Sequence, residues 1–373
     1  MRVAGEGLIN RRRRVEFSFD GRTYQGVEGD TLASALLAND IRLIGRSFKY
    51  HRPRGLLTAG SEEPNGLVTT GRGAGQEPNM RATMVELFDG LQARSQNAWP
   101  SLDFDLMAMN DLAAPFLGAG FYYKTFMWPA KFWERVYEPV IRRAAGLGAL
   151  SMRANADKYE KAWAHCDLLV IGAGPTGLMA ALTAARAGAD VVLAEEDMRT
   201  GGRLNAETFE VDGVPGHVWA EEVTRELQAM ENVRLLTRTT VTGAYDHGTY
   251  GALERLSPWD AAKKGAPREC FWRIVAKRAV LAAGALERPI AFQNNDRPGI
   301  MNAGAVRAYL NRWCVSPGQS VAVFGNNDDA HRTAADLLEA GVHVSALVDA
   351  RHDAVSDLDV PFYAGAQVCN SEG

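Results

Sequence analysis

The sequence has 373 residues, a formal net charge of −4 and a pI near 6.0. This length predicts two or three domains with ample hydrophobic core, and the slightly acidic balance argues against nucleic acid as the main partner. Neither a secretory leader pattern nor an apolar run of membrane-spanning length occurs, so we expect no membrane partner. The four cysteines lack metal-ligand spacing, which predicts a reduced, cytoplasmic protein without a metal site.

The first region, residues 1–90, is predicted to be a small α+β domain. Alternating apolar residues at 15–19 and a return strand over 22–27 flank an Asp-Gly turn and form a hairpin, and a helix over 32–38 follows. This order is typical of a ferredoxin-like β-grasp domain. We interpret the arginines at 11–14 as a solvated basic arm before the first strand, with an anionic surface or a subunit contact as the alternative.

The ferredoxin-like pattern raises the question of an iron–sulfur cluster. Plant-type ferredoxins hold their cluster with clustered cysteines in the loop that follows the helix. No cysteine precedes Cys166 in this chain. We therefore predict that the domain carries no iron–sulfur cluster.

The second region, residues 91–160, is rich in aromatic residues mixed with glycine and proline. The densest stretches are residues 116–123, 126–129 and 131–137. A connector of this kind cannot easily bury all its rings by itself, and aromatic residues are favoured at interfaces. We expect it to wrap a neighbouring domain or a partner subunit, with packing inside this chain as an equal alternative.

The third region contains the most informative motif, in which an apolar strand runs into Gly172-x-Gly174-x-x-Gly177 and then into an alanine-rich helix. The first glycine permits a tight turn, the second lets backbone approach a pyrophosphate, and the third lets helix and strand pack closely. Glu195 or Glu196 follows the next strand, where a carboxylate accepts hydrogen bonds from an adenosine ribose. The whole pattern predicts a dinucleotide-binding site.

Two nucleotide-type domains are predicted in this region. Residues 161–310 form the dinucleotide-binding domain, and residues 311–373 repeat the strand–helix–strand order. Only Gly325 of the fingerprint is kept in the repeat. Asp328 and Asp329 place negative charge at the helix N-terminus, where a phosphate would lie. We therefore interpret residues 311–373 as a partial second domain with a degenerate pocket.

No catalytic constellation stands out in the sequence. The seven histidines are separated, without a pair at metal-binding spacing. His51 lies among basic residues, and we interpret it as a hydrogen-bonded loop histidine, with a flavin phosphate or a partner acid as alternative neighbours. We assign no catalytic residue on this chain.

Several segments together carry a resemblance to a known family. They are residues 45–55, 61–65, 167–177, 239–247, 282–289 and 296–299. The chain resembles the alpha subunit of heterotetrameric sarcosine oxidase. This implies a Rossmann-type FAD/NAD(P)-binding fold with two dinucleotide-binding domains, preceded by a ferredoxin-like domain. The segment Phe-Lys-Tyr-His-Arg-Pro-Arg-Gly at 48–55 is more discriminating than the glycine fingerprint, which occurs in many flavoproteins and dehydrogenases.

The resemblance implies an amine oxidoreductase subunit that acts on a CH–NH group. Such a complex oxidatively demethylates sarcosine to glycine and hydrogen peroxide, and passes a one-carbon unit to tetrahydrofolate or releases it as formaldehyde. The partners would be beta, gamma and delta subunits; the beta subunit would hold FAD, and FMN would lie at the alpha–beta junction. Relatives continue into a folate-binding domain that this chain lacks, so we expect a truncated chain whose catalytic residues lie on a partner.

The resemblance also implies that the fingerprint site holds NAD+, although its chemistry fits FAD equally because both present an ADP moiety. The matching positions at the pyrophosphate turn are Gly172, Gly174, Thr176 and Gly177. Those at the adenosine end are Glu195, Glu196 and Asp197, with Arg203, Val241 and Ala283 near by. Gly202, beside Arg203, is expected to lie against the cofactor as well.

Two other functions remain open. One is a self-sufficient FAD-dependent NAD(P)H oxidoreductase, which would need an intact second nucleotide site. The other is the equivalent subunit of an opine-, proline- or glycine-oxidising complex, which shares the scaffold. The amine substrate is not decided by this sequence, because its pocket would lie on the partner.

Overall fold

The computed structural model describes the chain except residues 117, 119, 121–125, 156, 257–265 and 373, so part of the aromatic stretch at 116–123 lies outside the described residues. The chain folds into two compact units. One consists of Met1–Ala154 together with Arg288–Gly373, and the other consists of Asn155–Glu287. We call them unit 1 and unit 2. The chain leaves unit 2 after Glu287, so residues 288–310, expected in the dinucleotide-binding domain, belong to unit 1.

The N-terminal part of unit 1 is a β-grasp domain, as predicted. Its strands are β1 (Asn10–Phe19), β2 (Arg22–Glu28), β5 (Leu67–Thr70), β6 (Glu77–Arg81) and β7 (Leu91–Ser95), in the sheet order β2-β1-β7-β5-β6. Helix α1 (Leu32–Ala38) begins with a capping box in which the Thr31 side chain accepts from the Ser34 amide. Because β7 pairs in parallel with β1, the sheet extends beyond the expected boundary at residue 90.

The arginine run lies inside the first strand, so the interpretation as an arm before the strand is wrong. Strand β1 begins at Asn10, and Arg14 pairs with Val27 of β2. Arg13 lies within 2.7 Å of Glu28 in an exposed ion pair across the same two strands. The apolar alternation begins only at Val15, because the preceding residues of β1 are exposed on both faces.

Short elements complete the first half of unit 1. They are β3 (Gly45–Arg46), β4 (Pro53–Arg54), the 3-10 turns η1 (Gly73–Gly75), η2 (Leu106–Phe116) and η3 (Ala130–Phe132), the π-helical turn η4 (Trp133–Tyr137), and α3 (Glu138–Ala144). The last four form the aromatic connector, which contains only short helical turns among its described residues.

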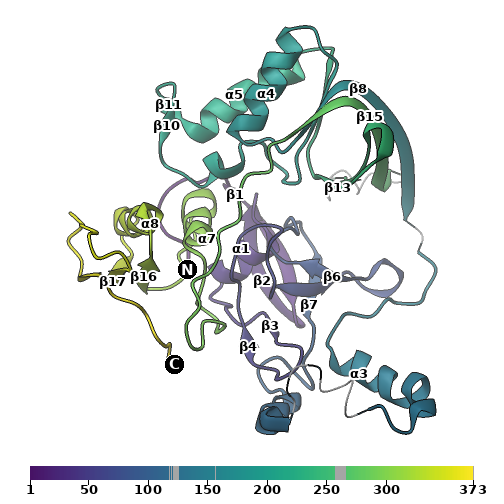
Figure 1. The fold of residues 1–373 in the computed structure, drawn as a ribbon, viewed down its shortest axis with the longest axis vertical. Helices are drawn as coiled ribbons and strands as arrows, with labels where there is room; N and C mark the ends of the chain where they lie inside the picture. The colour runs from purple at the N-terminus through teal and green to yellow at the C-terminus, as the bar shows by residue number, and fades with distance from the viewer. Residues whose placement is uncertain (117, 119, 121–125, 156, 257–265, 373) are drawn as a thin grey trace. The chain divides into compact units, whose positions relative to one another are not determined.

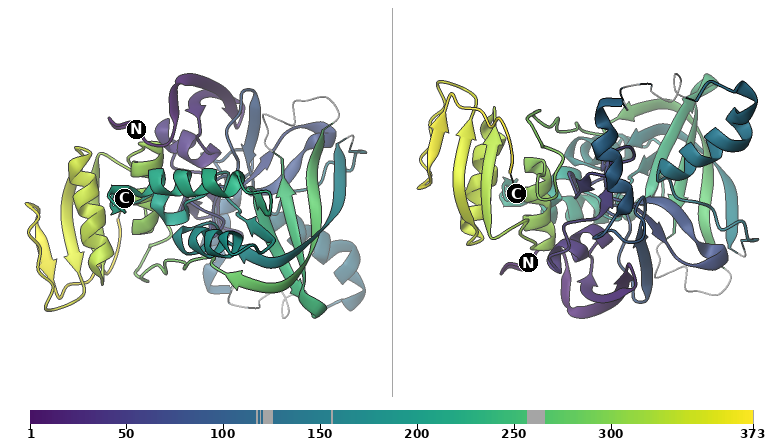
Figure 2. Two further views of the ribbon diagram at one scale, coloured as in Figure 1. Left: turned by 90° about the horizontal axis from the view of Figure 1, so that it is seen from above. Right: turned by 90° about the horizontal axis from the view of Figure 1, so that it is seen from below.

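The C-terminal part of unit 1 is a parallel strand–helix–strand arrangement. It contains α7 (Ala303–Arg307), the π-helical turn η7 (Ala308–Arg312), β16 (Ser320–Gly325), α8 (Asp328–Glu339), β17 (His343–Asp349) and β18 (Phe362–Ala364). Figure 2 shows α8 against the sheet, whose strand order is β16-β17-β18. Val323, Ala334, Leu337 and Leu347 form the core between them. The Asn302 amide donates to the Leu57 carbonyl, which joins this part to the N-terminal domain.

Unit 2 is built on a six-stranded sheet in the order β12-β9-β8-β15-β14-β13 (Figure 1), and β10 and β11 form a separate two-stranded sheet. Its elements are β8 (Lys158–Ile171), α4 (Pro175–Arg186), β9 (Val191–Ala194), η5 (Gly202–Asn205), β10 (Glu210–Val211), β11 (Val214–Pro215), α5 (Gly216–Gln228), β12 (Val233–Leu236), β13 (Thr239–Tyr245), η6 (Asp246–Gly248), β14 (Thr249–Arg255) and β15 (Pro267–Leu281). Strands β12, β9, β8 and β15 are parallel, and β14 and β13 extend the sheet antiparallel. This is a Rossmann-type arrangement, as expected, and its sheet is extended by an antiparallel β-meander.

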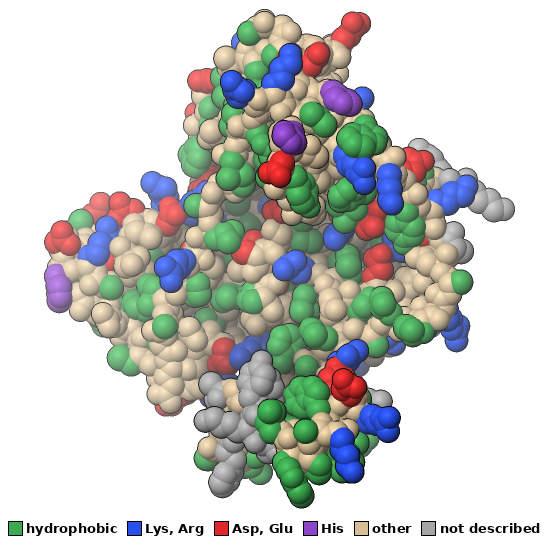
Figure 3. All heavy atoms as spheres, turned by 45° about the vertical axis from the view of Figure 1, so that its right-hand side comes forward, with side chains coloured by type: hydrophobic (Ala, Val, Ile, Leu, Met, Phe, Trp, Pro, Cys, Tyr) green, Lys and Arg blue, Asp and Glu red, His purple; other side chains and the backbone are tan. Residues whose placement is uncertain are grey.

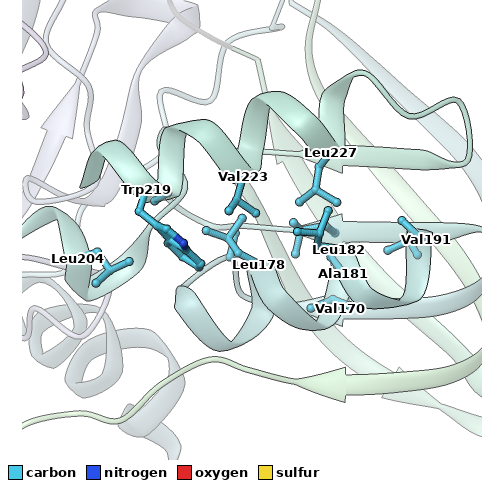
Figure 4. Close-up of a cluster of buried hydrophobic side chains, with 13 residues drawn as sticks. Val170, Leu178, Ala181, Leu182, Val191, Leu204, Trp219, Val223 and Leu227 are labelled. Atoms are coloured by element: carbon cyan, nitrogen blue, oxygen red, sulfur yellow. The ribbon is translucent and has the colours of Figure 1, made fainter. Parts of the chain in front are cut away.

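The core of unit 2 lies between its parallel strands and the helices α4 and α5. Figure 4 shows Leu178 and Leu182 of α4 facing Val223 and Leu227 of α5, all of them buried. The apolar residues of α5 recur at intervals of four, which places them on one helical face. This packing fixes the N-terminus of α4 against the end of β8.

Candidate dinucleotide-binding site

The connection between β8 and α4 requires glycine at two positions, once for the backbone conformation and once for a close approach. Gly172 has a φ of +98°, and a Cβ there would lie 2.5 Å from the Ala282 carbonyl oxygen. A Cβ on Gly177 would lie 1.8 Å from the Gly172 carbonyl oxygen, so glycine is what lets α4 begin so close to β8. At Gly174 a Cβ would meet no described atom within 4 Å, which leaves this side of the backbone open to a ligand.

Helix α4 begins at this turn with its N-terminus uncapped by any side chain. Gly174 is the N-cap residue, Pro175 is the first helical residue, and the first turn contains no acidic residue. The first amides of a helix lack intrahelical partners, and the positive end of its dipole lies there. Thr176 is exposed in this first turn. The helix end therefore offers free amides and positive potential to an anionic group.

The carboxylate of Glu195, which directly follows β9, is bonded to the glycine turn. One oxygen accepts from the Ala173 amide at 2.6 Å and the other from the Asp197 amide at 2.9 Å. The side chain is buried, and burial raises the pKa of Glu195 to about 7. A carboxylate can accept about four hydrogen bonds, so two acceptor positions remain for a ligand hydroxyl.

The two neighbouring acids have different surroundings. Glu196 is exposed, and Asp197 is partly buried with its side chain accepting from the Arg199 amide at 3.4 Å. The sequence left Glu195 and Glu196 as equal candidates for the ribose. In the structure Glu195 contacts the fingerprint backbone, whereas Glu196 lies at the surface.

The Gly201-Gly202 pair lies against the glycine turn. Both residues have positive φ, at +110° and +51°. The Gly201 amide donates to the Ala173 carbonyl at 2.8 Å, and a Cβ on Gly202 would lie 3.0 Å from the Gly174 Cα. Two backbone segments, 172–174 and 201–202, thus form adjoining walls of the site.

The remaining residues predicted for the site lie at different distances from the glycine turn. Arg203 donates from Nε to Glu207 at 2.5 Å and is more than half exposed. Ala283 is exposed just beyond β15, and its Cα would lie 3.2 Å from a Cβ on Gly172. Val241 lies on β13 and packs against a core cluster of the sheet, without a described contact to the glycine turn. The turn thus gathers its own glycines with Glu195, Gly202 and Ala283, while Arg203 and Val241 are tied elsewhere.

The backbone partners of this site were not predicted. The Ala173 amide holds Glu195, and the Thr239 amide at the start of β13 donates to the Glu195 carbonyl at 2.7 Å. The fingerprint leaves its second position unspecified, so no side chain signals the role of Ala173. The adjacency of Thr239 depends on the sheet order, which a local pattern does not encode.

The second strand–helix–strand, β16–α8–β17, uses its polar residues internally. Asp349 at the end of β17 is fully buried, and its carboxylate accepts from Arg351 at 2.8 Å and lies 2.8 Å from Nε2 of His331. The hydrogen bonds from Arg351 hold the pKa of Asp349 well below its usual range. Arg351 also bonds Asp328 at 2.8 Å, and Asn327 caps α8. This arrangement leaves the acid at the strand end occupied by the protein itself.

His51 is held by an aspartate of the same domain. Its Nδ1 lies 2.6 Å from Asp105 Oδ2, and both side chains are buried. Its Nε2 has no partner among the described residues. No group of three or more potential ligands that could hold a metal ion occurs in the described part of the chain. No helix there is long and apolar enough to cross a membrane.

The two domain patterns correspond to known families. Residues 167–264 match the family of FAD dependent oxidoreductases, and residues 12–98 match the 2Fe-2S iron-sulfur cluster binding domain. The fold is also that of L-proline dehydrogenase from P. horikoshii, with a TM-score of 0.61 and 21% identity over 96% of this chain and 62% of that chain. The chain is therefore a flavoprotein-type α/β protein with a ferredoxin-like N-terminal domain.

Similar proteins define a narrower class for this chain than its fold does. The chain is 57% identical over 100% of its length to the alpha subunit of sarcosine oxidase from Rhizobium meliloti, and 37% identical over 98% to that of Corynebacterium sp. strain U-96. It is also 30% identical over 49% of its length to a subunit of the opine oxidase of Agrobacterium tumefaciens, of which it covers 36%. The chain is homologous along its whole length to the sarcosine oxidase alpha subunits. It spans 38% and 34% of the length of the first two relatives.

The prediction that the N-terminal domain has no iron–sulfur cluster is contradicted, because residues 12–98 match a 2Fe-2S cluster-binding family. The prediction relied on ligands alone, since no cysteine precedes Cys166. The match instead extends over most of the β-grasp domain, whose strands and helix need no cysteine to form. Thiolates are the usual ligands of such clusters and residues 12–98 supply none, so we derive no chemical step through a cluster.

Proposed function

We propose that this chain is part of the alpha subunit of a sarcosine oxidase-type complex. Such a complex would oxidatively demethylate sarcosine to glycine, form hydrogen peroxide, and pass the one-carbon unit to tetrahydrofolate or release it as formaldehyde. The observation that carries the proposal is the 57% identity over the whole chain to the alpha subunit of a sarcosine oxidase. The role of this chain would be to bind a dinucleotide and to support the subunit that oxidises the amine.

The dinucleotide would be NAD+, held by the turn between β8 and α4. Three features support this assignment: the open backbone at Gly174, the uncapped N-terminus of α4, and the carboxylate of Glu195 beside the turn. The amides of the first turn of α4 would hold the pyrophosphate, and the remaining acceptor positions of Glu195 would receive ribose hydroxyls. A bound nicotinamide or flavin supplies hydride-transfer chemistry, and FAD fits the same ADP-binding features.

The aromatic connector supports a partner subunit. Many of its large hydrophobic side chains are exposed, and Figure 3 shows hydrophobic side chains gathered on one surface of its helical turns. The most exposed of them are Leu112, Trp128, Leu150 and Met152, with 70–90% of their surface accessible. Exposed apolar surface of this extent is typical of protein interfaces. We assign it to the subunit that carries the amine-oxidising site.

The substrate has one supported alternative. The match to an opine oxidase subunit, at 30% identity over 49% of the chain, fits an equivalent subunit of a complex acting on another secondary amine. A self-sufficient NAD(P)H oxidoreductase is less well supported, because the acid at the end of β17 is bonded by Arg351 and His331.

The test is to purify the whole complex from cells that express the complete reading frame together with its neighbouring genes. The released nucleotides are identified by mass, and peroxide is measured with sarcosine, proline and an opine as alternative substrates. We expect NAD+ together with flavins, and peroxide with sarcosine above the other amines.

A variant with a blocked turn separates binding from scaffolding. Gly177→Ala should remove NAD+ from the purified complex while the other subunits still copurify. The proposal fails if the isolated chain carries FAD and oxidises NAD(P)H by itself, or if another amine is the preferred substrate.

A further inference from the structure

Unit 1 contains a small cavity that the proposed dinucleotide site does not use. It has a volume of about 180 Å³ and lies between the loop that follows β4 and the segment that precedes α7. Arg54, Asn65, Asn295, Asp296 and Arg297 supply polar walls, and Leu57, Pro64, Pro289 and Ile300 supply apolar ones. All of these residues belong to unit 1.

A buried carboxylate shapes one wall of this cavity. Glu63 is 1% exposed, and its two oxygens accept hydrogen bonds from the backbone amides of Leu57, Thr58, Asn65 and Gly66 at 2.7 to 3.1 Å. A carboxylate that receives this many amides holds the loop in a single shape. The opposite wall is fixed to the same loop, since the Asn302 amide donates to the Leu57 carbonyl at 2.9 Å. The cavity is therefore preformed.

Two arginines beside the cavity share one carboxylate. Arg52 and Arg54 both pair with Asp296, Arg52 through two hydrogen bonds of 2.8 Å. The side chains of Arg54 and Asp296 are only 19% and 26% exposed. Two guanidinium groups thus share the carboxylate of Asp296 in partly desolvated surroundings, and the carboxylate of Glu63 is already engaged by four backbone amides, so a further anion can still pair with these arginines. Burial and the neighbouring Arg52 also lower the pKa of Arg54.

Arg54 has hydrogen-bond donors to spare. Only its Nη1 donates within the described structure, to the carbonyl and the carboxylate of Asp296. Nε and Nη2 have no such partner among the described residues. A guanidinium edge that presents two parallel N–H groups matches the two oxygens of a carboxylate or a phosphate group. Amide groups of Asn65 and Asn295 also line the cavity and can donate to the same ligand.

We propose that this cavity binds a small oxyanion, a carboxylate or a phosphate group, with Arg54 as its main anchor. The volume of about 180 Å³ is below the range of pockets for larger organic ligands, so the ligand is a small acid or an inorganic anion. Neither the glycine turn of unit 2 nor the aromatic connector takes part.

The proposal is tested by calorimetric titration of the purified complex with inorganic phosphate and, separately, with acetate, at constant ionic strength set with chloride. We expect saturable binding of one anion per chain, and the ratio of the two affinities identifies phosphate or carboxylate as the preferred group. Arg54→Gln should weaken binding at least tenfold. Arg13→Gln is the matched control, because Arg13 forms an exposed ion pair with Glu28 far along the sheet, and it should leave binding unchanged.

Two further variants keep the test decisive if Arg54→Gln does not fold. Asp296→Asn removes the competing carboxylate and should strengthen anion binding at least threefold. Ile300→Phe fills the cavity without changing any charge and should abolish binding. The proposal would be overturned if the folded variants among Arg54→Gln, Asp296→Asn and Ile300→Phe bound the anion as tightly as the wild-type protein does. It would also be overturned if chloride competed for the site as strongly as phosphate does.

Discussion

The two strand–helix–strand units of this chain have the same backbone order and opposite chemistry at the helix start. In β8–α4–β9 the helix begins at Gly174 with neither a side-chain cap nor an acidic residue. In β16–α8–β17 the Asn327 side chain caps the helix, and Asp328 and Asp329 occupy its first turn. A free, positive helix end can receive a phosphate, whereas a capped and acidic one repels it.

The acids at the ends of the second strands differ in the same sense. Glu195 contacts only backbone amides of its own site and keeps free acceptor positions. Asp349 is bonded by Arg351 and faces His331, so its charge is balanced within the fold. The same supersecondary structure thus serves binding in one place and packing in the other. The following changes test this division.

The largest effect is expected from Gly177→Ala. The added methyl group would lie 1.8 Å from the Gly172 carbonyl oxygen. Both positions are fixed by the backbone, so the clash is relieved only if α4 moves away from the turn. Overpacking of this kind costs about 1–3 kcal/mol of stability. We expect loss of the bound dinucleotide, measured by mass analysis of the released nucleotides, and a lower thermal midpoint.

Gly325→Ala is the matched change in the other unit. Its Cβ would lie 2.4 Å from the Ala330 Cβ, so it also crowds a helix against a strand. Stability should fall, but the dinucleotide should remain bound. Retention of the dinucleotide by Gly177→Ala, or its loss from Gly325→Ala, would contradict the assigned roles.

The next largest effect is expected from Asp349→Asn. This change removes the negative charge that Arg351 and His331 face, and a hydrogen bond to a charged group contributes about 1.5–3 kcal/mol. We expect faster amide exchange in β17 and α8, measured by hydrogen–deuterium exchange with mass detection. Exchange in α4 should not change.

The pH dependence of the wild-type protein sharpens this second test. Because the pKa of Asp349 is lowered in the folded state, its contribution to stability is complete above the unfolded pKa of about 4 and is lost as the pH falls through the folded value. Protection of β17 in the wild-type protein should therefore decrease in acid. Asp349→Asn should be equally unprotected across this range, and acid-sensitive protection in the variant would contradict the assignment.

A moderate effect is expected from the titration of Glu195. Burial raises its pKa to about 7, so the protonated form stabilises the fold below the unfolded value and this contribution is lost as the pH rises through 7. Ribose hydroxyls are hydrogen-bond donors, so they bind the ionised carboxylate of Glu195 better than its protonated form. Dinucleotide affinity should therefore rise several-fold between pH 6 and pH 8, measured by calorimetry. Glu195→Gln should abolish this dependence, while Glu196→Gln should retain it.

The local parts of this comparison could be predicted from the sequence. Gly172 and Gly177 are required by a positive φ and by a close backbone approach, and such requirements leave glycine at fixed spacings. The acidic first turn of α8 was equally visible.

The remaining parts depend on contacts between distant segments. The choice between Glu195 and Glu196 follows from which one the fold buries beside Ala173, and both have the same charge in the sequence. Asp349 gains His331 from the facing helix, which no spacing indicates. The polar start of β1 was missed because pairing with β2, and not burial, makes it a strand.

The smallest effect is expected from Arg203→Ala. The sequence resemblance places Arg203 beside the nucleotide, but its Nε donates to Glu207 at 2.5 Å and its side chain is 58% exposed. An ion pair with one exposed partner contributes about 1 kcal/mol or less, and a guanidinium engaged in it adds little to a ligand. Dinucleotide affinity should fall less than threefold. Glu207→Gln weakens the same ion pair and should change the dinucleotide affinity by a similar factor. A tenfold loss in Arg203→Ala alone would mean that the guanidinium leaves Glu207 and contacts the nucleotide, so that the binding site extends from the glycine turn to η5.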